Sequence, residues 1–273
     1  MTLRLGVVAD LHHTPDPPRD LAYHNPFDIP NGLPRLRRAI DWFADQHVDT
    51  LVLAGDLSHN GRPSELRTVL ATAASRWPGP ILAVAGNHDT LESHDALSDA
   101  IADLGDARIT LPGPRGLAFR DLRVAGLDQP KPDLSTATPA WGSDVVILIS
   151  HFPLFSREQA LVERGLRYAG DLTDHASAAH ALRRRRAPTI VINGHLHARD
   201  TYLEGPSLQL SVAALVEPPF EATIVEIHAA TATHVRRRAR PMSLSTSQSS
   251  LVLAPSDEAI TLNARSCARQ FPT

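Results

Sequence analysis

The sequence predicts an α/β fold in which helices cover a parallel β-sheet. Short apolar runs bounded by Gly, Pro or a polar residue occur at residues 3–9, 50–54 and 80–85, as is typical of buried strands. The segments between these runs carry apolar residues at helical spacing, so strands and helices alternate. Such alternation implies parallel strands joined by crossover helices. Shorter runs farther along the chain predict a second, more antiparallel sheet.

The composition is that of a globular protein that binds a small ligand. With 273 residues, 42% hydrophobic and 21% charged, the chain suits one large domain, placed at residues 1–240, with a Ser-rich tail at 241–273. Its 27 basic and 30 acidic residues give a net charge of -3, without the basic excess of nucleic-acid and anionic-membrane binders. The single cysteine, Cys267, permits no intramolecular disulfide, and no apolar run reaches the ~20 residues of a membrane span. We therefore expect a cytoplasmic protein without stable binding to nucleic acid or membrane.

The first strand runs directly into Asp10-Leu11-His12. Side chains alternate along an extended segment, so Asp10 and His12 face the same side and can offer one oxygen and one nitrogen to a single metal ion. The alternative is an ordinary turn followed by a solvent-exposed histidine, and this pair alone does not decide between them.

A proline-rich loop follows at residues 14–34, with Tyr23, His24 and Asn25 in its middle. Structureless loops of this length inside a compact domain are usually functional or disordered. The loop leaves the same strand end as the first candidate pair, so these three residues are candidates for substrate contacts. Apolar residues at helical spacing then predict a helix that ends near Gln46.

Two more strands end in the same way. The strand at 50–54 is followed by Gly55-Asp56, and the strand at 80–85 by Gly86-Asn87-His88-Asp89. A carboxylate such as Asp56 can bridge two cations, because each of its oxygens serves one of them. In parallel sheets, ligands bind beyond the carboxyl ends of the strands. These polar residues should therefore converge with the first pair.

The rest of the chain supplies two further strand ends. The run at 145–149 leads to His151, and the run at 189–193 leads to Gly194-His195-Leu196-His197. The stretch at 157–173 is a candidate rim or lid, and the tail should be partly disordered or packed on the surface, without a catalytic role. The other predicted elements are helices at 63–73, 94–105 and 174–186, three short strands within 107–127, and strands at 200–204, 208–212, 222–228 and 233–237 that complete the second sheet.

Together the strand ends offer nitrogen and oxygen donors and no thiolate. They are Asp10, His12, Asp56, Asn87, His88, His151, His195 and His197. This set favours Mn, Fe, Ni or Zn, and it is too large for one ion, so we expect two transition metal ions that share Asp56. Two ions about 3.5–4 Å apart can hold a hydroxide between them and neutralise a phosphoryl group during in-line attack. A serine hydrolase or a phosphate loop is disfavoured, because Gly-x-Ser-x-Gly and Gly-x-x-x-x-Gly-Lys are missing.

The order of these motifs, from Asp10-x-His12 to Gly194-His195-x-His197, resembles that of the calcineurin-like metallophosphoesterase family. The resemblance extends from Leu3 to about Val235. It implies a four-layer αββα sandwich, in which two mixed sheets are flanked by helices.

The resemblance also implies roles, carried over position by position. His88 would contact the phosphate and either protonate the leaving oxygen or stabilise its charge, and Asp89 would be a structural hydrogen-bond partner. One ion would be bound by Asp10, His12, Asp56 and His197, and the other by Asp56, Asn87, His151 and His195.

The motifs are similar to those of the bacterial branch that includes cyclic-nucleotide phosphodiesterases. Protein phosphatases of the family usually carry Glu in place of Asp89 and Arg in place of Asn60, and purple acid phosphatases need a tyrosine ligand soon after the position of Asp56. We therefore expect a phosphodiesterase for a small nucleotide-like substrate, with Asn60 among the substrate contacts.

One position departs from the family pattern. Many relatives carry Asp three residues after the bridging carboxylate, where it orients the catalytic histidine, whereas this chain carries His59. Either His88 is oriented differently or His59 contacts the substrate. The alternatives left open are a nucleotide pyrophosphohydrolase, a phosphomonoesterase that uses the same site, and a non-catalytic binding protein of the same fold.

Overall fold

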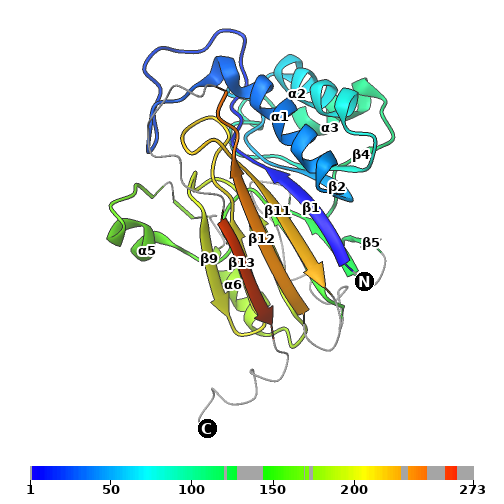
Figure 1. The fold of residues 1–273 in the computed structure, drawn as a ribbon, viewed down its shortest axis with the longest axis vertical. Coiled ribbons are helices and arrows are strands. Elements are labelled where there is room, and N and C mark those ends of the chain that lie inside the picture. Colours follow the sequence, from blue (N-terminus) through cyan, green and yellow to red (C-terminus); the bar gives the residue numbers. More distant parts are fainter. Residues whose placement is uncertain are drawn as a thin grey trace.

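The computed structural model describes residues 2–119, 122–127, 144–168, 170–171, 175–228, 233–244 and 256–262. Two mixed β-sheets pack against each other, and helices flank them (Figure 1). The predicted α/β sandwich is therefore confirmed.

The first sheet has seven strands in the order β13-β12-β11-β1-β2-β3-β4. Strands β1 to β4 are parallel, and β11, β12 and β13 extend the sheet in antiparallel fashion from β1. A 3-10 turn at Ile29–Asn31 precedes helix α1, and α1, α2 and α3 lie together over one face (Figure 1). The bounds are β1 (Thr2–Val8), α1 (Gly32–Asp45), β2 (Thr50–Ala54), α2 (Pro63–Arg76), β3 (Ile81–Val84), α3 (Ala96–Leu104), β4 (Ile109–Thr110), β11 (Glu221–His228), β12 (Thr233–Pro241) and β13 (Ser256–Leu262).

The second sheet has six strands in the order β5-β6-β7-β8-β10-β9. Strands β6, β7, β8 and β10 are parallel, and only the edge strands β5 and β9 run antiparallel to their neighbours. The bounds are β5 (Leu117–Phe119), β6 (Leu122–Gly126), β7 (Val146–Ser150), α5 (Glu158–Glu163), α6 (His175–Arg183), β8 (Thr189–Asn193), β9 (Asp200–Glu204) and β10 (Ser207–Ser211).

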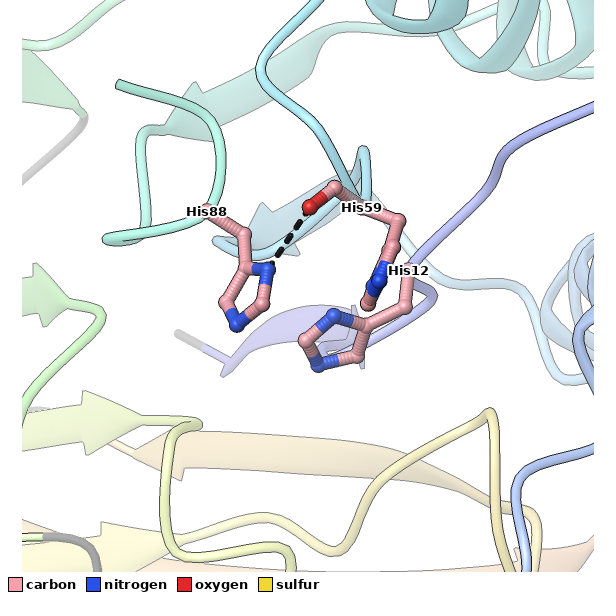
Figure 2. A group of neighbouring side chains, drawn as sticks. All are labelled: His12, His59 and His88. Carbon is pink, nitrogen blue, oxygen red and sulfur yellow. Dashed lines mark hydrogen bonds between the residues drawn. The ribbon is translucent and has the colours of Figure 1, made fainter. Parts of the chain in front are cut away.

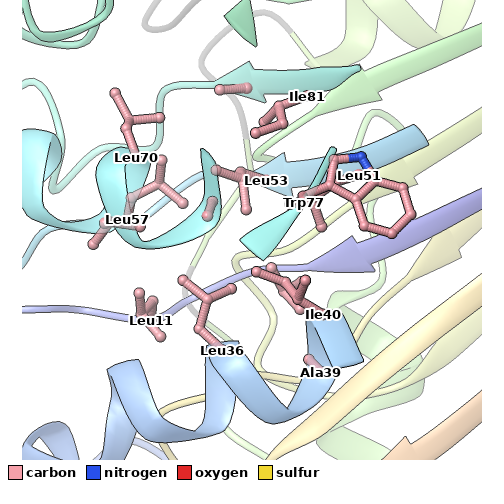
Figure 3. Close-up of a cluster of buried hydrophobic side chains, with 14 of the residues drawn as sticks. Leu11, Leu36, Ala39, Ile40, Leu51, Leu53, Leu57, Leu70, Trp77 and Ile81 are labelled. Atoms are coloured by element: carbon pink, nitrogen blue, oxygen red, sulfur yellow. The ribbon is translucent and has the colours of Figure 1, made fainter. Parts of the chain in front are cut away.

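Alternation along the buried strands builds the layers. In β2, Leu51 and Leu53 pack against the helices, near Leu36 of α1 (Figure 3), whereas Val52 and Ala54 face the second sheet. In β7 and β8, alternate side chains likewise face either the interior between the two sheets or the layer that contains α6. Each fully buried leucine of this kind contributes about 1.5–3 kcal/mol relative to an exposed one. The layers hold the carboxyl ends of β1, β2, β3, β7 and β8 at one edge.

Two predictions about the sheets are wrong. The strands predicted at 222–228 and 233–237 do not complete the second sheet, because β11 pairs with β1 and β12 pairs with β11. Strand β4 also joins the first sheet, beside β3. The second sheet is mainly parallel rather than more antiparallel. Apolar patterning predicts that a strand is buried, but it does not specify which strand edge will be its neighbour.

The tail contains a strand that the sequence pattern did not predict. Residues 256–262 form β13, which pairs with β12 from Ser256 to Leu262. The rest of the tail that was predicted to be partly disordered, at positions 245–255 and 263–273, lies outside the described residues, as does the first residue, Asp174, of the helix predicted at 174–186. The division of the chain after residue 240 stays a prediction.

Candidate metal centre

The loops that leave β1 and β2 run side by side. The backbone N–H of Asp10 donates to the carbonyl oxygen of Gly55 at 3.0 Å, and the N–H groups of Leu11 and His12 donate to the carbonyl oxygen of Asp56, each at 2.9 Å. Because both strands are parallel neighbours, these hydrogen bonds continue the sheet by one step. They bring the two candidate carboxylates to the same point.

The backbone at this edge is strained where the candidate ligands lie. A positive φ occurs at Asp10 (54°), His12 (48°), Asp56 (50°), His195 (64°) and His197 (53°). Such a conformation costs a non-glycine residue of the order of 1–3 kcal/mol, and it persists where the surroundings hold it in place, often at functional sites. Five of the eight non-glycine residues with positive φ in the described part of the chain are predicted metal ligands, and the other three are Asp20, His47 and Phe220.

The first cluster contains Asp10, His12 and His197, all buried, with potential ligand atoms within 4.8 Å of one another. The Nε2 atoms of His12 and His197 lie 3.4 Å apart, and Nε2 of His197 lies 3.6 Å from Oδ1 of Asp10. Nε2 of His12 lies 3.6 Å from Oδ2 of Asp56. These are the four residues predicted for one ion.

The second cluster is centred on His151, whose Nε2 lies 3.4 Å from Oδ2 of Asp56 and 3.2 Å from Oδ1 of Asn87. Nδ1 of His195 lies 3.3 Å from the same nitrogen. Oδ2 of Asp56 is therefore within 3.6 Å of a histidine from each cluster. Asp56 occupies the bridging position that two ions would share.

The residues present fit a pair of cations. Buried polar atoms in proteins are nearly always hydrogen-bonded, yet Oδ2 of Asp10 is buried and has no hydrogen-bond partner among the described residues. A positive ion between these groups would satisfy this oxygen. Imidazole nitrogens together with carboxylate and amide oxygens form a donor set that transition metals accept.

Burial and the close spacing of charged groups shift the pKa values of the candidate ligands. Burial raises the pKa of Asp10, although His197 and His151 oppose this shift. Burial acts against ionised Asp56 as well, but its interactions with His151 outweigh this effect and hold the pKa of Asp56 well below its usual value. Conversely, burial lowers the pKa of His151, and the charge of Asp56 more than compensates, raising it to about 9. The site therefore binds protons that a cation would displace.

Glycines allow these loops to approach closely. A Cβ atom on Gly86 would overlap the backbone nitrogen and the carboxylate of Asp56, and one on Gly55 would overlap the ring of His151. Asp89 is fully buried and accepts hydrogen bonds from the backbone N–H groups of Ser58 (2.7 Å) and Gly86 (2.9 Å). Asp89 thus ties the loop after β3 to the loop after β2.

His88 lies at the margin of the clusters. Its backbone N–H donates to Oδ1 of Asp56 at 2.8 Å, and its Nδ1 donates to the carbonyl oxygen of His59 at 2.7 Å. Figure 2 shows the rings of His88, His59 and His12 close together, with centroids 4.5 Å apart for His12 and His88 and 5.2 Å for His59 and His88. The carbonyl only accepts, so Nδ1 of His88 carries a proton and Nε2 is left to act on a ligand.

The residues predicted for substrate contacts fall into two groups. Tyr23 and His59 lie beside the clusters: the ring of Tyr23 is 5.1 Å from that of His197, and the ring of His59 stacks on His88. The side chain of Asn60 instead donates to Glu65 at 2.9 Å.

His24 and Asn25 are held by neighbouring backbone. Nε2 of His24 donates to the carbonyl oxygen of Leu196 at 2.9 Å, and Nδ2 of Asn25 donates to that of Pro218 at 3.2 Å. The predicted rim at 157–173 also packs near Leu196, through Leu161. The segments around the site therefore meet at the loop after β8.

Three residues near the clusters were missed by the sequence analysis. Phe152 lies 4.1 Å from the ring of His195, and Phe27 stacks on His197 at 5.5 Å. Phe27 also lines a cavity of about 370 Å³ formed with prolines of its own loop. Glu217 is fully buried, with Oε1 2.8 Å from Nδ1 of His197. Only Glu217 left a signal in the sequence, because it follows an apolar run just as the predicted ligands do.

No helix within the described ranges is both long and apolar enough to cross a membrane.

Comparison of the full chain with known structures finds several that share this fold. A dimetal phosphatase from Danio rerio is 14% identical, with a TM-score of 0.63 over 96% of this chain and 99% of that chain. The purple acid phosphatase PPD1 from yellow lupin is 14% identical, with a TM-score of 0.59 over 98% of this chain and 55% of that chain. GAP50, the anchor in the inner membrane complex of Plasmodium, is 10% identical, with a TM-score of 0.54 over 96% and 89%. At these identities the similarity establishes the fold alone.

The family is established by the sequence itself. The chain matches the model of the calcineurin-like phosphoesterases over residues 3–199, a range that contains every predicted metal ligand. A search of curated protein sequences finds no match. The chain, with its buried Asp and His clusters suited to two metal ions, belongs to the calcineurin-like phosphoesterase family.

Proposed function

We propose that this chain is a phosphodiesterase that hydrolyses a small, nucleotide-like substrate, cyclic nucleotides among them, with two ions of Mn, Fe, Ni or Zn. The observation that carries the proposal is the position of Asp56, whose Oδ2 lies 3.6 Å from Nε2 of His12 and 3.4 Å from Nε2 of His151. One carboxylate between two histidine clusters suits a pair of ions rather than a single one. Two such ions polarise phosphoryl oxygens and activate water when they are bound.

The protein's own groups then have distinct tasks. Asp10, His12, Asp56 and His197 hold one ion, and Asp56, Asn87, His151 and His195 hold the other. The carbonyl oxygen of His59 holds the Nδ1–H of His88, so a His88 imidazolium would give the second proton, on Nε2, to the leaving oxygen and keep the one on Nδ1. General acid catalysis of this kind contributes about 10²–10⁴ in rate.

The surroundings support a substrate with an apolar or aromatic portion. The rings of Tyr23, Phe27 and Phe152 lie next to candidate ligand histidines. Aromatic rings offer faces on which a nucleobase can stack, and the cavity beside Phe27 offers additional room. These features support a nucleotide-like substrate, as in the bacterial cyclic-nucleotide branch of the family. The cytoplasmic location expected from the composition is a separate part of the proposal.

A second candidate is phosphomonoester hydrolysis at the same site. It is favoured by the similarity of the fold to the dimetal phosphatase from Danio rerio. The two reactions differ in whether the scissile phosphate carries one ester group or two.

A metal-reconstitution assay tests the proposal. Protein stripped with chelator and loaded with Mn, Fe, Ni or Zn is given bis(p-nitrophenyl) phosphate, 2′,3′- and 3′,5′-cyclic nucleotides, dinucleotide pyrophosphates and p-nitrophenyl phosphate. Turnover of diesters without direct release of inorganic phosphate supports the phosphodiesterase. Preference for the monoester favours the second candidate, preference for the pyrophosphates identifies a pyrophosphohydrolase, and the lack of turnover by fully loaded protein would favour a binding role.

A further inference from the structure

Glu217 is a buried carboxylate with two contacts, one on each oxygen. Oε1 lies 2.8 Å from Nδ1 of His197, and Oε2 accepts the backbone N–H of Asn25 at 2.5 Å. The side chain is fully buried. Burying a carboxylate is costly unless it is paired and hydrogen-bonded, so the burial of Glu217 needs a structural explanation.

The contact with His197 sets the chemistry of that imidazole. A carboxylate only accepts, so Nδ1 of His197 carries the proton, and Nε2 becomes the atom with a free lone pair once the ring is neutral. Nε2 is the atom that faces the first cluster, 3.4 Å from Nε2 of His12 and 3.6 Å from Oδ1 of Asp10. Carboxylates that orient metal-binding histidines in this way typically affect metal affinity by 10–100-fold.

The contact with Asn25 reaches into the loop between β1 and α1. The ring of Tyr23 packs beside His197, and the N–H of Asp28 donates to the carbonyl oxygen of Val216 at 2.7 Å. The segment 23–28 thus rests on the residues next to Glu217. It also carries Phe27, which stacks on His197.

We propose that Glu217 is a positioning residue that couples metal binding by His197 to the order of segment 23–28. The carboxylate of Glu217 holds both the ring of His197 and the N–H of Asn25, and the positive charge of an ion bound by His197 would stabilise it. Metal loading therefore fixes the wall of the substrate site formed by Tyr23 and Phe27. This inference rests on the proposed function only for calling that wall part of a substrate site.

Glu217→Gln removes the negative charge of the side chain and breaks the bridge between the two contacts. An amide has one acceptor oxygen, so it can accept from His197 or from Asn25, but not from both in the present geometry. Glu221→Gln is a matched control, because Glu221 is also buried but pairs with Arg199 at 3.4 Å rather than with a candidate metal ligand.

The experiment combines metal titration with hydrogen exchange of the full chain, without substrate. In the wild type, Mn loading should slow amide exchange in residues 21–28. In Glu217→Gln, one of the two ions should bind about tenfold or more weakly, and metal should no longer slow that exchange. Glu221→Gln should retain both responses, and Glu217→Asp should bind that ion with an affinity between those of the wild type and Glu217→Gln.

Two results would overturn the inference. One is wild-type affinity for both ions in folded Glu217→Gln, and the other is an amide exchange rate in residues 21–28 of the wild type that does not change when metal is added. The second measurement needs no variant, so poor folding of Glu217→Gln leaves a decisive test. Failure of the proposed function would look different, since protein that binds two ions and responds in exchange but hydrolyses no phosphoester would retain the coupling.

Discussion

Nδ1 of His88 lies 2.7 Å from the backbone carbonyl oxygen of His59, at the chain position where many relatives are expected to carry an orienting Asp. The backbone carbonyl group of His59 thus orients the ring of His88, as the carboxylate of an Asp side chain would otherwise do. The imidazole of His59 is free of that task and stacks on His88 with an interplanar angle of 30°. Of the two alternatives raised by the sequence, the different orientation of His88 is seen here, and the contact of His59 with substrate stays a prediction.

His59→Ala should therefore spare the chemical step. The substitution retains the carbonyl oxygen, so kcat should stay within about threefold of the wild type, a change of less than 1 kcal/mol in activation free energy. KM should rise several-fold, because the ring that borders the space beside His88 is removed. Steady-state kinetics of the metal-loaded protein measures both. A loss of kcat of about a hundredfold would assign the imidazole itself a part in the reaction.

Substitutions at Asn87 and His88, adjacent in the chain, should have opposite consequences. Asn87→Ala removes an amide oxygen from the second cluster and should weaken one ion. His88→Ala should retain both ions and lower kcat by about 10²–10⁴, the usual contribution of a general acid. Metal content by elemental analysis, measured beside kcat, separates the two. If His88→Ala lost an ion, the division of roles between these neighbours would be wrong.

The convergence of the site was predictable from sequence, because each candidate ligand directly follows a buried strand. Parallel strands bring their carboxyl ends to one edge, and the order of the sheets makes β1, β2 and β3 neighbours, as it does β7 and β8. The apolar pattern of the sequence and the observed strand order therefore both place the candidate ligands at the same edge. The roles carried over from the family still await the substitutions described above.

The features that escaped prediction depend on contacts between distant segments. Strand β11 is buried along almost its whole length, which indicates a central strand but not that its neighbours are β1 and β12. Glu217 contacts His197 and Asn25 across 20 and 192 positions of sequence. The hydrogen bond from His88 to the carbonyl oxygen of His59 could not be predicted either, because every residue has a backbone carbonyl group. Such pairings are fixed by packing of the whole domain.

Gly86→Ala should disrupt the centre and the fold together. Its Cβ would overlap the backbone nitrogen and carboxylate of Asp56, which the surrounding loops hold in place. Overpacking of this kind costs about 1–3 kcal/mol or more, so the urea midpoint of the metal-free protein should fall and metal affinity should drop as Asp56 shifts. Gly113→Ala is the matched control, since a Cβ there meets nothing within 4 Å. Equal stability of the two variants would contradict the close approach between Gly86 and Asp56.

Metal binding should strengthen as pH rises. The charge of Asp56 overcomes the effect of burial and raises the pKa of His151 to about 9, so this ligand is protonated at neutral pH in the metal-free protein. An ion must displace that proton, and the apparent affinity should increase by up to about tenfold per pH unit for each proton released. The increase should persist up to pH 9, where His151 is half neutral before metal binds. Calorimetric titration with Mn at pH 6 to 8.5, in buffers that differ in ionisation enthalpy, measures both affinity and proton release. His228→Ala, which alters an exposed histidine at the far end of β11, should leave the slope unchanged. An affinity that stays flat across this range would mean that His151 is already neutral or is not a ligand.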